Sequence, residues 1–349
     1  MFIIIFIVIA TFAVLDFYLN KNLFASLAVL LLICVAGLRS INTGLDTYNY
    51  YFDYNSVVSG FSPINSQEKG YILLEKLFSL FNSPVSVFFF FISALTLILL
   101  TIGYSRLSIT NNCTAFLLLY YYSRFYINRD LNQIRASLAA SIILCSLIFV
   151  YGHKPIKFFI CILVATLIHS AAIIALIIYP VFFLFKKISK QKIAFCYIIT
   201  LILSSILSIP LSPFIKGYNN NRLNAYINDQ IYISGNGLKN PIILLQILIS
   251  LIGLYYLLRQ DGISDKYMAV LVTYMISTVI LILLSQYNTL AGRTSTFFAT
   301  VEPIVVMDIL TQQFGKKLSS FLMIIFSLVI FILINYSTGG IPNLNYQFL

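Results

Sequence analysis

Polar and aromatic side chains gather in residues 37–54, GLRSINTGLDTYNYYFDY, directly after the second hydrophobic run of the chain. The guanidinium group of Arg39 suits bidentate contact with phosphate oxygens. The carboxyl group of Asp46 could take a proton from a hydroxyl, and the rings of Tyr48 and Tyr50 suit sugar faces and a membrane interface. This segment favours a site for a sugar- or phosphate-bearing ligand, with an interfacial aromatic belt around a capped turn as the alternative.

A second candidate lies in residues 124–142, RFYINRDLNQIRASLAASI. We expect a membrane span that begins at Asn128 as N-cap, which places Arg135 about 10 Å into the span on the face that also carries Asn132. A buried arginine costs several kcal/mol unless it is paired or faces a wet cavity, so this charge predicts a functional site. A structural ion pair with an acidic residue elsewhere is the alternative.

Two further polar groups interrupt apolar sequence. His169 lies in an apolar block of about thirty residues, which is too long for one span. We expect two shorter helices that meet near His169, whose imidazole could act as a general base, donate to a diphosphate or simply tie helices together. Arg293 follows Gly292 at the outer end of a predicted span, where it could be a second phosphate clamp or a snorkelling interfacial arginine.

The composition indicates an integral membrane protein, because only 9% of the residues are charged and 60% are hydrophobic, whereas a soluble domain has roughly a quarter of its residues charged. Apolar runs of 17–20 residues predict helices rather than barrel strands. We therefore expect an all-α polytopic protein with about twelve membrane segments in a single membrane domain over residues 1–349. The predicted spans lie near 2–19, 22–38, 84–103, 112–128, 131–151, 155–185 (two helices), 193–212, 241–258, 267–286, 293–312 and 318–336.

Lysine and arginine separate between the two predicted faces of the membrane. The lysine cluster within 186–192 should be cytoplasmic, and alternation from there places six of the eight arginines outside. The polar segments 39–83, 213–240 and 337–349 fall on the same outer side. Within the first of them, residues 70–81 predict an amphipathic helix on the outer leaflet. Because arginine is the better planar clamp for phosphate, we expect the chemistry at the outer face.

Several classes of site are disfavoured. The five cysteines lie in apolar stretches without metal-ligand spacing, so we expect neither a disulfide nor a metal site. The net charge of +11 is spread over short loops, which indicates membrane orientation and anionic headgroups rather than nucleic acid. Residues 1–19 lack a basic n-region and a cleavage motif, so we expect this helix to be retained.

Five sequence blocks follow one another along most of the chain: GLRS with TGLDTYNYYFDYN, then EKGYILLEKLF, NQIRASLAASI, IHSAAIIALIIYP and AGR. Together they resemble the EpsG-like family of Wzy-type polysaccharide polymerases. The resemblance implies a GT-C-like glycosyltransferase of the bacterial cytoplasmic membrane. It would join undecaprenyl-diphosphate-linked oligosaccharides at the periplasmic face, for O-antigen or a related surface glycan. No metal, cofactor or nucleotide sugar is implied, and a chain-length regulator protein could be a partner.

On this resemblance the polar residues divide into three roles. Arg135, with Arg39 or Arg293, would hold the donor diphosphate and stabilise charge as it leaves. Asp46 or His169 would deprotonate the acceptor hydroxyl, with inversion at the anomeric carbon. Tyr48, Tyr50 and Gln133 would line the sugar path, and Arg129 would also bind substrate. The predicted substrate-binding residues are Arg39, Tyr48, Tyr50, Arg129, Gln133, Arg135 and Arg293.

Other functions also fit a polytopic protein with buried arginine and histidine. A lipid-linked oligosaccharide flippase would use its charges along a cavity open to both faces, whereas the arginines here are biased outward. An O-antigen ligase would use lipid A core as its acceptor. An intramembrane O-acetyltransferase would need a cytoplasmic route for its acyl donor, and a permease would line a transport path with the same charges.

Overall fold

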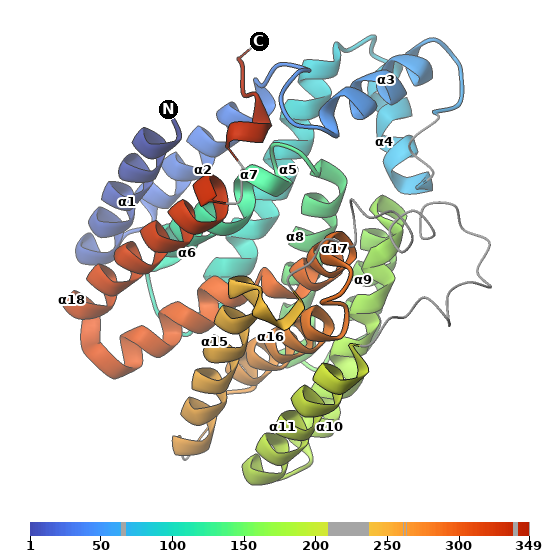
Figure 1. Cartoon of the computed structure of the whole chain (residues 1–349). Helices are drawn as coiled ribbons and strands as arrows, with labels where there is room; N and C mark the ends of the chain where they lie inside the picture. Colours follow the sequence, from blue (N-terminus) through green and yellow to red (C-terminus); the bar gives the residue numbers. More distant parts are fainter. Residues whose placement is uncertain (64–67, 209–236, 261, 263, 338–340, 349) are drawn as a thin grey trace. The chain divides into compact units, whose positions relative to one another are not determined.

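The computed structural model describes residues 1–63, 68–208, 237–260, 262, 264–337 and 341–348, and within them the chain is helical (Figure 1). The β structure among these residues is one bridge, between Arg39 and Phe348. The predicted all-α class is confirmed. The α-helices are α1 Phe2–Leu19, α2 Leu23–Gly37, α3 Thr47–Val58, α4 Lys69–Ser79, α5 Val85–Leu107, α6 Thr114–Tyr121, α7 Ile127–Arg129, α8 Ile134–Tyr151, α9 Pro155–Ile168, α10 Ile178–Lys186, α11 Lys190–Leu207, α15 Pro241–Arg259, α16 Asp265–Leu283, α17 Asn288–Ala299 and α18 Glu302–Ile332. The shorter turns are η1 Tyr122–Tyr126 and η4 Leu333–Ser337 (π-helical), and η2 Ser170–Ile177, η3 Gly237–Lys239 and η5 Pro342–Leu344 (3-10).

Seven helical stretches in the described part of the chain are long and apolar enough to cross a membrane. They are α1, α5, α8, α11, α15, α16 and the stretch Glu302–Tyr336. Three shorter apolar stretches are Leu23–Gly37, Pro155–Ile168 and Ser170–Lys186. Because a helix needs about 20 apolar residues to cross the hydrocarbon core, these lengths support a polytopic membrane protein, and the count of twelve segments stays a prediction.

The long apolar block before residue 186 is interrupted at His169, as the sequence predicts. α9 ends at Ile168, and His169 adopts an extended conformation with φ −149° and ψ 113°. The N–H of His169 donates to the carbonyl of Ala165 at 2.8 Å, and its own carbonyl accepts from the N–H of Ala172 at 2.9 Å. The imidazole is therefore carried by a break between two helical segments rather than by the middle of a helix.

The predicted span 293–312 is wrong at its start. α17 ends at Ala299, and α18 begins at Glu302, directly before Pro303. Proline has no N–H to continue a preceding helix but fits the first turn of a new one, which explains the break. α18 is interrupted at Gly315, where φ is 70° and ψ is 175°. Two helical segments therefore meet within the gap near 313–317 that separates the predicted spans. Glycine tolerates this positive φ because it has no Cβ.

The chain forms two compact units, residues 1–173 with 306–349 and residues 174–305. The single membrane domain over 1–349 stays a prediction. In the first unit α8 packs against α5 and α9, and α2 packs against α1 and α5. Helix α4 packs against α9, and there a Cβ on Gly70 would lie 2.8 Å from the carbonyl oxygen of Leu167. That close approach holds the start of α4 beside the end of α9, next to His169.

In the second unit α16 packs against α10, α11, α15 and α17. Buried polar side chains connect these helices by hydrogen bonds. Tyr197 Oη on α11 donates to Ser250 Oγ on α15 at 2.7 Å, and Tyr274 Oη on α16 donates to Glu302 Oε2 at 3.0 Å. Glu302 thus has a tyrosine partner within its own unit. Most of the predicted segment 213–240 lies outside the described residues.

Candidate functional site

The polar segment between α2 and α5 folds into two short helices, α3 and α4, whose packed faces carry acids and phenols. The buried residues of α3 are Thr47, Tyr50, Asp53, Tyr54 and Val57. On α4, Tyr71 and Glu75 are buried, and the buried Glu68 stands at the N-cap position. The spacing of three and seven residues puts Glu68, Tyr71 and Glu75 on one helix face. Three carboxyl groups, counting Asp53, are therefore taken out of water in this small region.

Glu68 brings together the two residues for which the sequence predicts the chief chemical roles. Arg135 Nη1 donates to Glu68 Oε2 at 2.6 Å, and His169 Nδ1 lies 3.6 Å from Glu68 Oε1. Ser170 Oγ donates to the same Oε1 at 3.5 Å. Burial alone would raise the pKa of Glu68, but the imidazole of His169 and the charge of Arg135 outweigh it and lower the pKa to about 2. Glu68 is therefore an ionised carboxylate that faces a guanidinium and an imidazole.

The guanidinium of Arg135 also lies over two aromatic rings. Its Cζ is 5.2 Å from the ring centroid of Tyr50 and 5.6 Å from that of Tyr71. These are cation–π distances, which favour arginine over lysine at this position. The two rings are themselves 6.1 Å apart. Arg135 is thus held by one carboxylate and two phenol rings from α3 and α4, and its Nε has no hydrogen-bond partner among the described residues.

The helix start predicted before Arg135 is wrong. Asn128 lies within α7 rather than at an N-cap, and α8 begins only at Ile134, so Arg135 is the second residue of its helix. The cause is the place of Asp130, which follows the end of α7 and does not belong to the first turn of a span. Its carboxylate accepts from Tyr121 Oη at 2.6 Å and from Ser137 Oγ at 3.1 Å, so the chain turns before α8 starts. Arg135 consequently lies in the first turn of α8 and not seven residues into a helix.

Arg39 is buried, with only 1% of its surface exposed. Its guanidinium donates to the carbonyl of Ala36 and lies 4.7 Å from the ring centroid of Phe89. Nε and Nη2 have no partner among the described residues. The charges of Arg39 and Arg135 both act on the phenol of Tyr71, which therefore connects the two arginines electrostatically.

The C-terminal segment 341–348 covers Arg39, and Figure 1 shows this segment in red beside the connection from α2 to α3. Ser40 N–H donates to the carbonyl of Gln347 at 2.8 Å, and Gly44 N–H donates to that of Leu344 at 2.7 Å. Tyr346 Oη donates to the carbonyl of Val35 at 2.8 Å. These contacts hold the C-terminal segment beside the buried Arg39.

The other predicted residues have varied surroundings. Asp46 is half-buried, and its N–H donates to Asn132 Oδ1 at 2.8 Å, which joins the start of α3 to the turn before α8. Gln133 is the N-cap residue of α8, two positions before Arg135. The ring of Tyr48 is 59% exposed. Arg129 is buried over the ring of Phe125, at 5.1 Å.

Arg293 is half-buried on α17, in the second unit. The predicted residues that the structure brings together are therefore Tyr50, Arg135 and His169, all in the first unit. Sequence reasoning missed Glu68 and Glu75 as site residues, because it interpreted residues 70–81 as an amphipathic helix on the outer leaflet. In the structure Leu77 and Phe81 are exposed instead. The spacing of the two glutamates, with Tyr71 between them, is the signal that could have identified the buried face.

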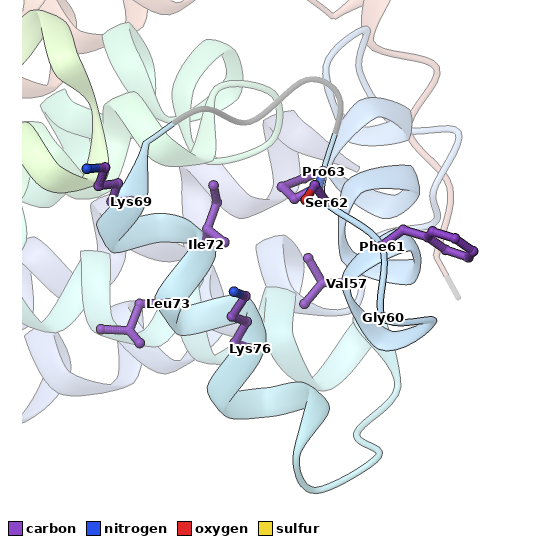
Figure 2. Close-up of a pocket in the computed structure, with 9 residues that line it drawn as sticks. All are labelled: Val57, Gly60, Phe61, Ser62, Pro63, Lys69, Ile72, Leu73 and Lys76. Atoms are coloured by element: carbon purple, nitrogen blue, oxygen red, sulfur yellow. The ribbon is translucent and has the colours of Figure 1, made fainter.

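An open cavity of about 470 Å³ lies between the end of α3 and another face of α4 (Figure 2). Lys69, Ile72 and Lys76 border it from α4, and the ring of Phe61 points away from it in Figure 2. Two ammonium groups beside apolar side chains suit an anionic, partly apolar group. The described residues that line it are Val57, Gly60, Phe61, Ser62, Pro63, Lys69, Ile72, Leu73 and Lys76.

We compared the chain with protein-family models, curated proteins and solved structures. Neither a curated protein nor a solved structure matches the chain. The EpsG family model matches residues 22–348, nearly the whole chain, and so includes every candidate residue described above. The break at His169, the acids and tyrosines of α3 and α4 and the first turn of α8 all lie within the matched range. The chain therefore belongs to the EpsG family, a family of Wzy-like polysaccharide polymerases, and is a membrane protein of the polysaccharide-polymerase type.

Proposed function

We propose that this protein joins undecaprenyl-diphosphate-linked oligosaccharide repeat units at the outer face of the bacterial cytoplasmic membrane. The product would be an O-antigen or a related surface glycan, and the fold a GT-C-like arrangement of about twelve segments. The observation that carries the proposal is the group formed by Arg135, Glu68 and His169 at the mouth of α8. It combines a cation for a diphosphate with an imidazole for a hydroxyl proton, in a chain with apolar helices beside it for a polyprenyl tail.

Arg135 is the proposed diphosphate-binding residue. A guanidinium makes short, charge-assisted hydrogen bonds to phosphate oxygens, and Nε of Arg135 is still without a partner among the described residues. As the bond from the anomeric carbon to the diphosphate oxygen breaks, negative charge grows on that oxygen, and a fixed guanidinium stabilises it. Arg39 or Arg293 is the proposed second clamp, as the sequence suggested.

His169 is the proposed base. A carboxylate next to one imidazole nitrogen fixes the ring orientation and stabilises the imidazolium that forms. Glu68 faces Nδ1 of His169 at 3.6 Å, so Nε2 is the nitrogen for the acceptor hydroxyl. That hydroxyl oxygen forms the new bond to the anomeric carbon, with inversion, while its proton passes to Nε2. Asp46 is the alternative base.

The sugar path would follow the phenol rings of α3 and α4. Tyr50 and Tyr71 form a packed pair beside Arg135, and the exposed Tyr48 extends the aromatic surface along α3. Gln133 and Arg129 flank the start of α8 and would contact polar groups of the oligosaccharide. A chain-length regulator protein remains a further proposed partner.

The test is glycan length on a gel, from a deletion strain that carries wild type, Arg135→Ala or His169→Ala. We expect a ladder with wild type and single-repeat glycan with both variants. Arg259→Ala is the matched control for Arg135, because Arg259 also lies over a tyrosine ring, at 4.8 Å from the centroid of Tyr255. His153→Ala is the control for His169, since these are the two histidines of the chain.

The deletion strain itself separates the rival functions. Single-repeat glycan on the surface without the gene indicates a polymerase. Loss of all surface glycan would favour a flippase or a ligase, and an unchanged ladder without the gene would contradict polymerisation. A normal ladder with Arg135→Ala, in protein present at the wild-type level, would remove Arg135 from the proposed role.

A further inference from the structure

Glu75 is a buried acid that the proposed chemistry does not use. It lies on the packed face of α4, and 0% of its surface is exposed. Neither Oε1 nor Oε2 has a hydrogen-bond partner among the described residues. Leaving a buried polar group unsatisfied costs about 1–3 kcal/mol, and more when the group is charged. A carboxylate in this position would be expensive, and a neutral carboxylic acid would be much less so.

The groups around Glu75 come from two neighbouring helices and from α4 itself. On α3, the charge of Asp53 acts on Glu75, and Glu75 in turn acts on the phenol of Tyr54. On α4, the hydroxyl of the buried Tyr71 has no partner among the described residues. From α8, the charge of Arg135 acts on Glu75 with the opposite sign to Asp53.

The remaining neighbours are one turn or more away or apolar. Glu68, with His169 beyond it, stands on the same face of α4 at the other side of Tyr71. From α5, Phe88 contacts the rings of Tyr54 and Tyr71. Arg135 acts on Glu75 and already pairs with Glu68, and the charge of Arg39 also reaches Tyr71. An ionised Glu75 would add a further negative charge near the guanidinium that is proposed to bind a diphosphate.

We propose that Glu75 is a positioning residue of the candidate site, a neutral carboxylic acid near Asp53 that keeps Arg135 available to an anionic substrate. The inference rests on the proposed function, because the anionic substrate is the diphosphate of that reaction. Glu75 acts through Arg135 and Tyr71 and does not contact the reacting atoms. Its proton removes one of two mutually repelling negative charges, those of Asp53 and Glu75.

The expected signature is loss of binding at alkaline pH. Burial, and then the charge of Asp53, raise the pKa of Glu75 to about 8. Below that pH the acid is neutral and the site is competent, and above it the added charge opposes an anion. If only the protonated form binds, the apparent Kd equals the intrinsic Kd divided by the protonated fraction. The Kd should then rise about tenfold between pH 7 and pH 9.

The experiment measures binding of undecaprenyl diphosphate esterified to one sugar by the full-length protein in lipid nanodiscs, from pH 7 to pH 9.5. This diester keeps its charge over that range, so a change in Kd reports the protein. We expect the tenfold rise with wild type and a flat profile with Glu75→Gln, which is neutral at every pH. Asp53→Asn removes the neighbouring charge, so the rise should begin at lower pH. Lys154→Gln, at the exposed N-cap position of α9, is the control and should keep the wild-type midpoint.

Each outcome of this experiment supports or overturns the positioning role of Glu75. A pH rise of equal size in wild type and Glu75→Gln would overturn the role of Glu75 and leave the proposed function standing. Loss of binding by folded Glu75→Gln at every pH would also overturn it, because the neutral isostere should bind. Absence of binding by wild type at any pH would contradict the proposed function, and Glu75 with it. If Glu75→Gln does not accumulate, the lower midpoint of Asp53→Asn carries the test.

Discussion

Glu68 Oε2 accepts from Arg135 Nη1 at 2.6 Å, and this ion pair joins the residue before α4 to the first turn of α8. Only 13% of the Arg135 side chain and 8% of the Glu68 side chain are exposed. A buried ion pair adds little net stability against an apolar replacement, but removal of one partner leaves a costly buried charge. A single substitution in this pair should therefore have large, measurable effects on stability and activity.

Glu68→Gln should reduce both stability and activity. The amide keeps the size of the side chain but leaves Arg135 without its counter-ion, which costs about 3–5 kcal/mol for a well-buried pair. We expect a lower Tm for the purified protein and single-repeat glycan in complemented cells. The double variant Glu68→Gln with Arg135→Gln should recover part of the Tm, because it leaves no unpaired charge. A Glu68→Gln protein with wild-type Tm and a full ladder would contradict this.

Because Glu68 is ionised in the folded protein, we expect the protein to lose stability in acid. The pKa of Glu68 is lowered from its ordinary value of 4.5 to about 2. Because the folded pKa lies below that of the unfolded chain, the stabilisation is complete above pH 4.5 and is lost as the pH falls toward 2. Thermal unfolding between about pH 5 and pH 3 should therefore show a steeper fall in Tm for wild type than for Glu68→Gln. Parallel falls in the two proteins would refute the assignment.

Two substitutions of Tyr71 separate the contribution of its ring to stability and activity from that of its hydroxyl. The ring lies 5.6 Å from the guanidinium carbon of Arg135, but the hydroxyl has no partner among the described residues. Tyr71→Phe should change the unfolding free energy by less than about 1 kcal/mol and retain polymerisation, because an unsatisfied group is removed and the ring stays. Tyr71→Leu should cost about 2 kcal/mol or more through lost cation–π and aromatic packing. Equal effects of the two substitutions would show that the hydroxyl is the important part.

Gly70→Ala tests whether the close packing of α4 against α9 positions Glu68. The added Cβ would lie 2.8 Å from the carbonyl oxygen of Leu167, so α4 must shift or α9 must give way. We expect roughly 1–3 kcal/mol of destabilisation and a shortened glycan ladder. Gly262→Ala is the matched control, because no atom lies within 4 Å of the added Cβ there. A Gly70→Ala protein that behaves like Gly262→Ala would mean that the contact is not tight in solution.

The sequence was sufficient for the class of the protein and for the break at His169. Water is absent from the bilayer core, so spanning segments must satisfy their own backbone groups, and long apolar runs then mean helices. A block of about thirty apolar residues exceeds one span, and a polar residue in its middle marks the interruption. Arginine and histidine in apolar surroundings likewise stand out locally, which is why Arg135 and His169 were identified from the sequence.

Tertiary structure decided where α8 begins and which acids are buried. Asp130 ends the preceding helical run because its carboxylate accepts from Tyr121 and from Ser137, and no local pattern reveals that pairing. A glutamate on a short amphipathic helix is usually solvated, so the sequence favoured a helix on the outer leaflet and no buried acid on α4. The close approach of Gly70 to Leu167 and the phenol rings of α3 turn Glu68 and Glu75 inward instead. Burial depends on which surfaces meet, and that is a property of the packed chain rather than of any one segment.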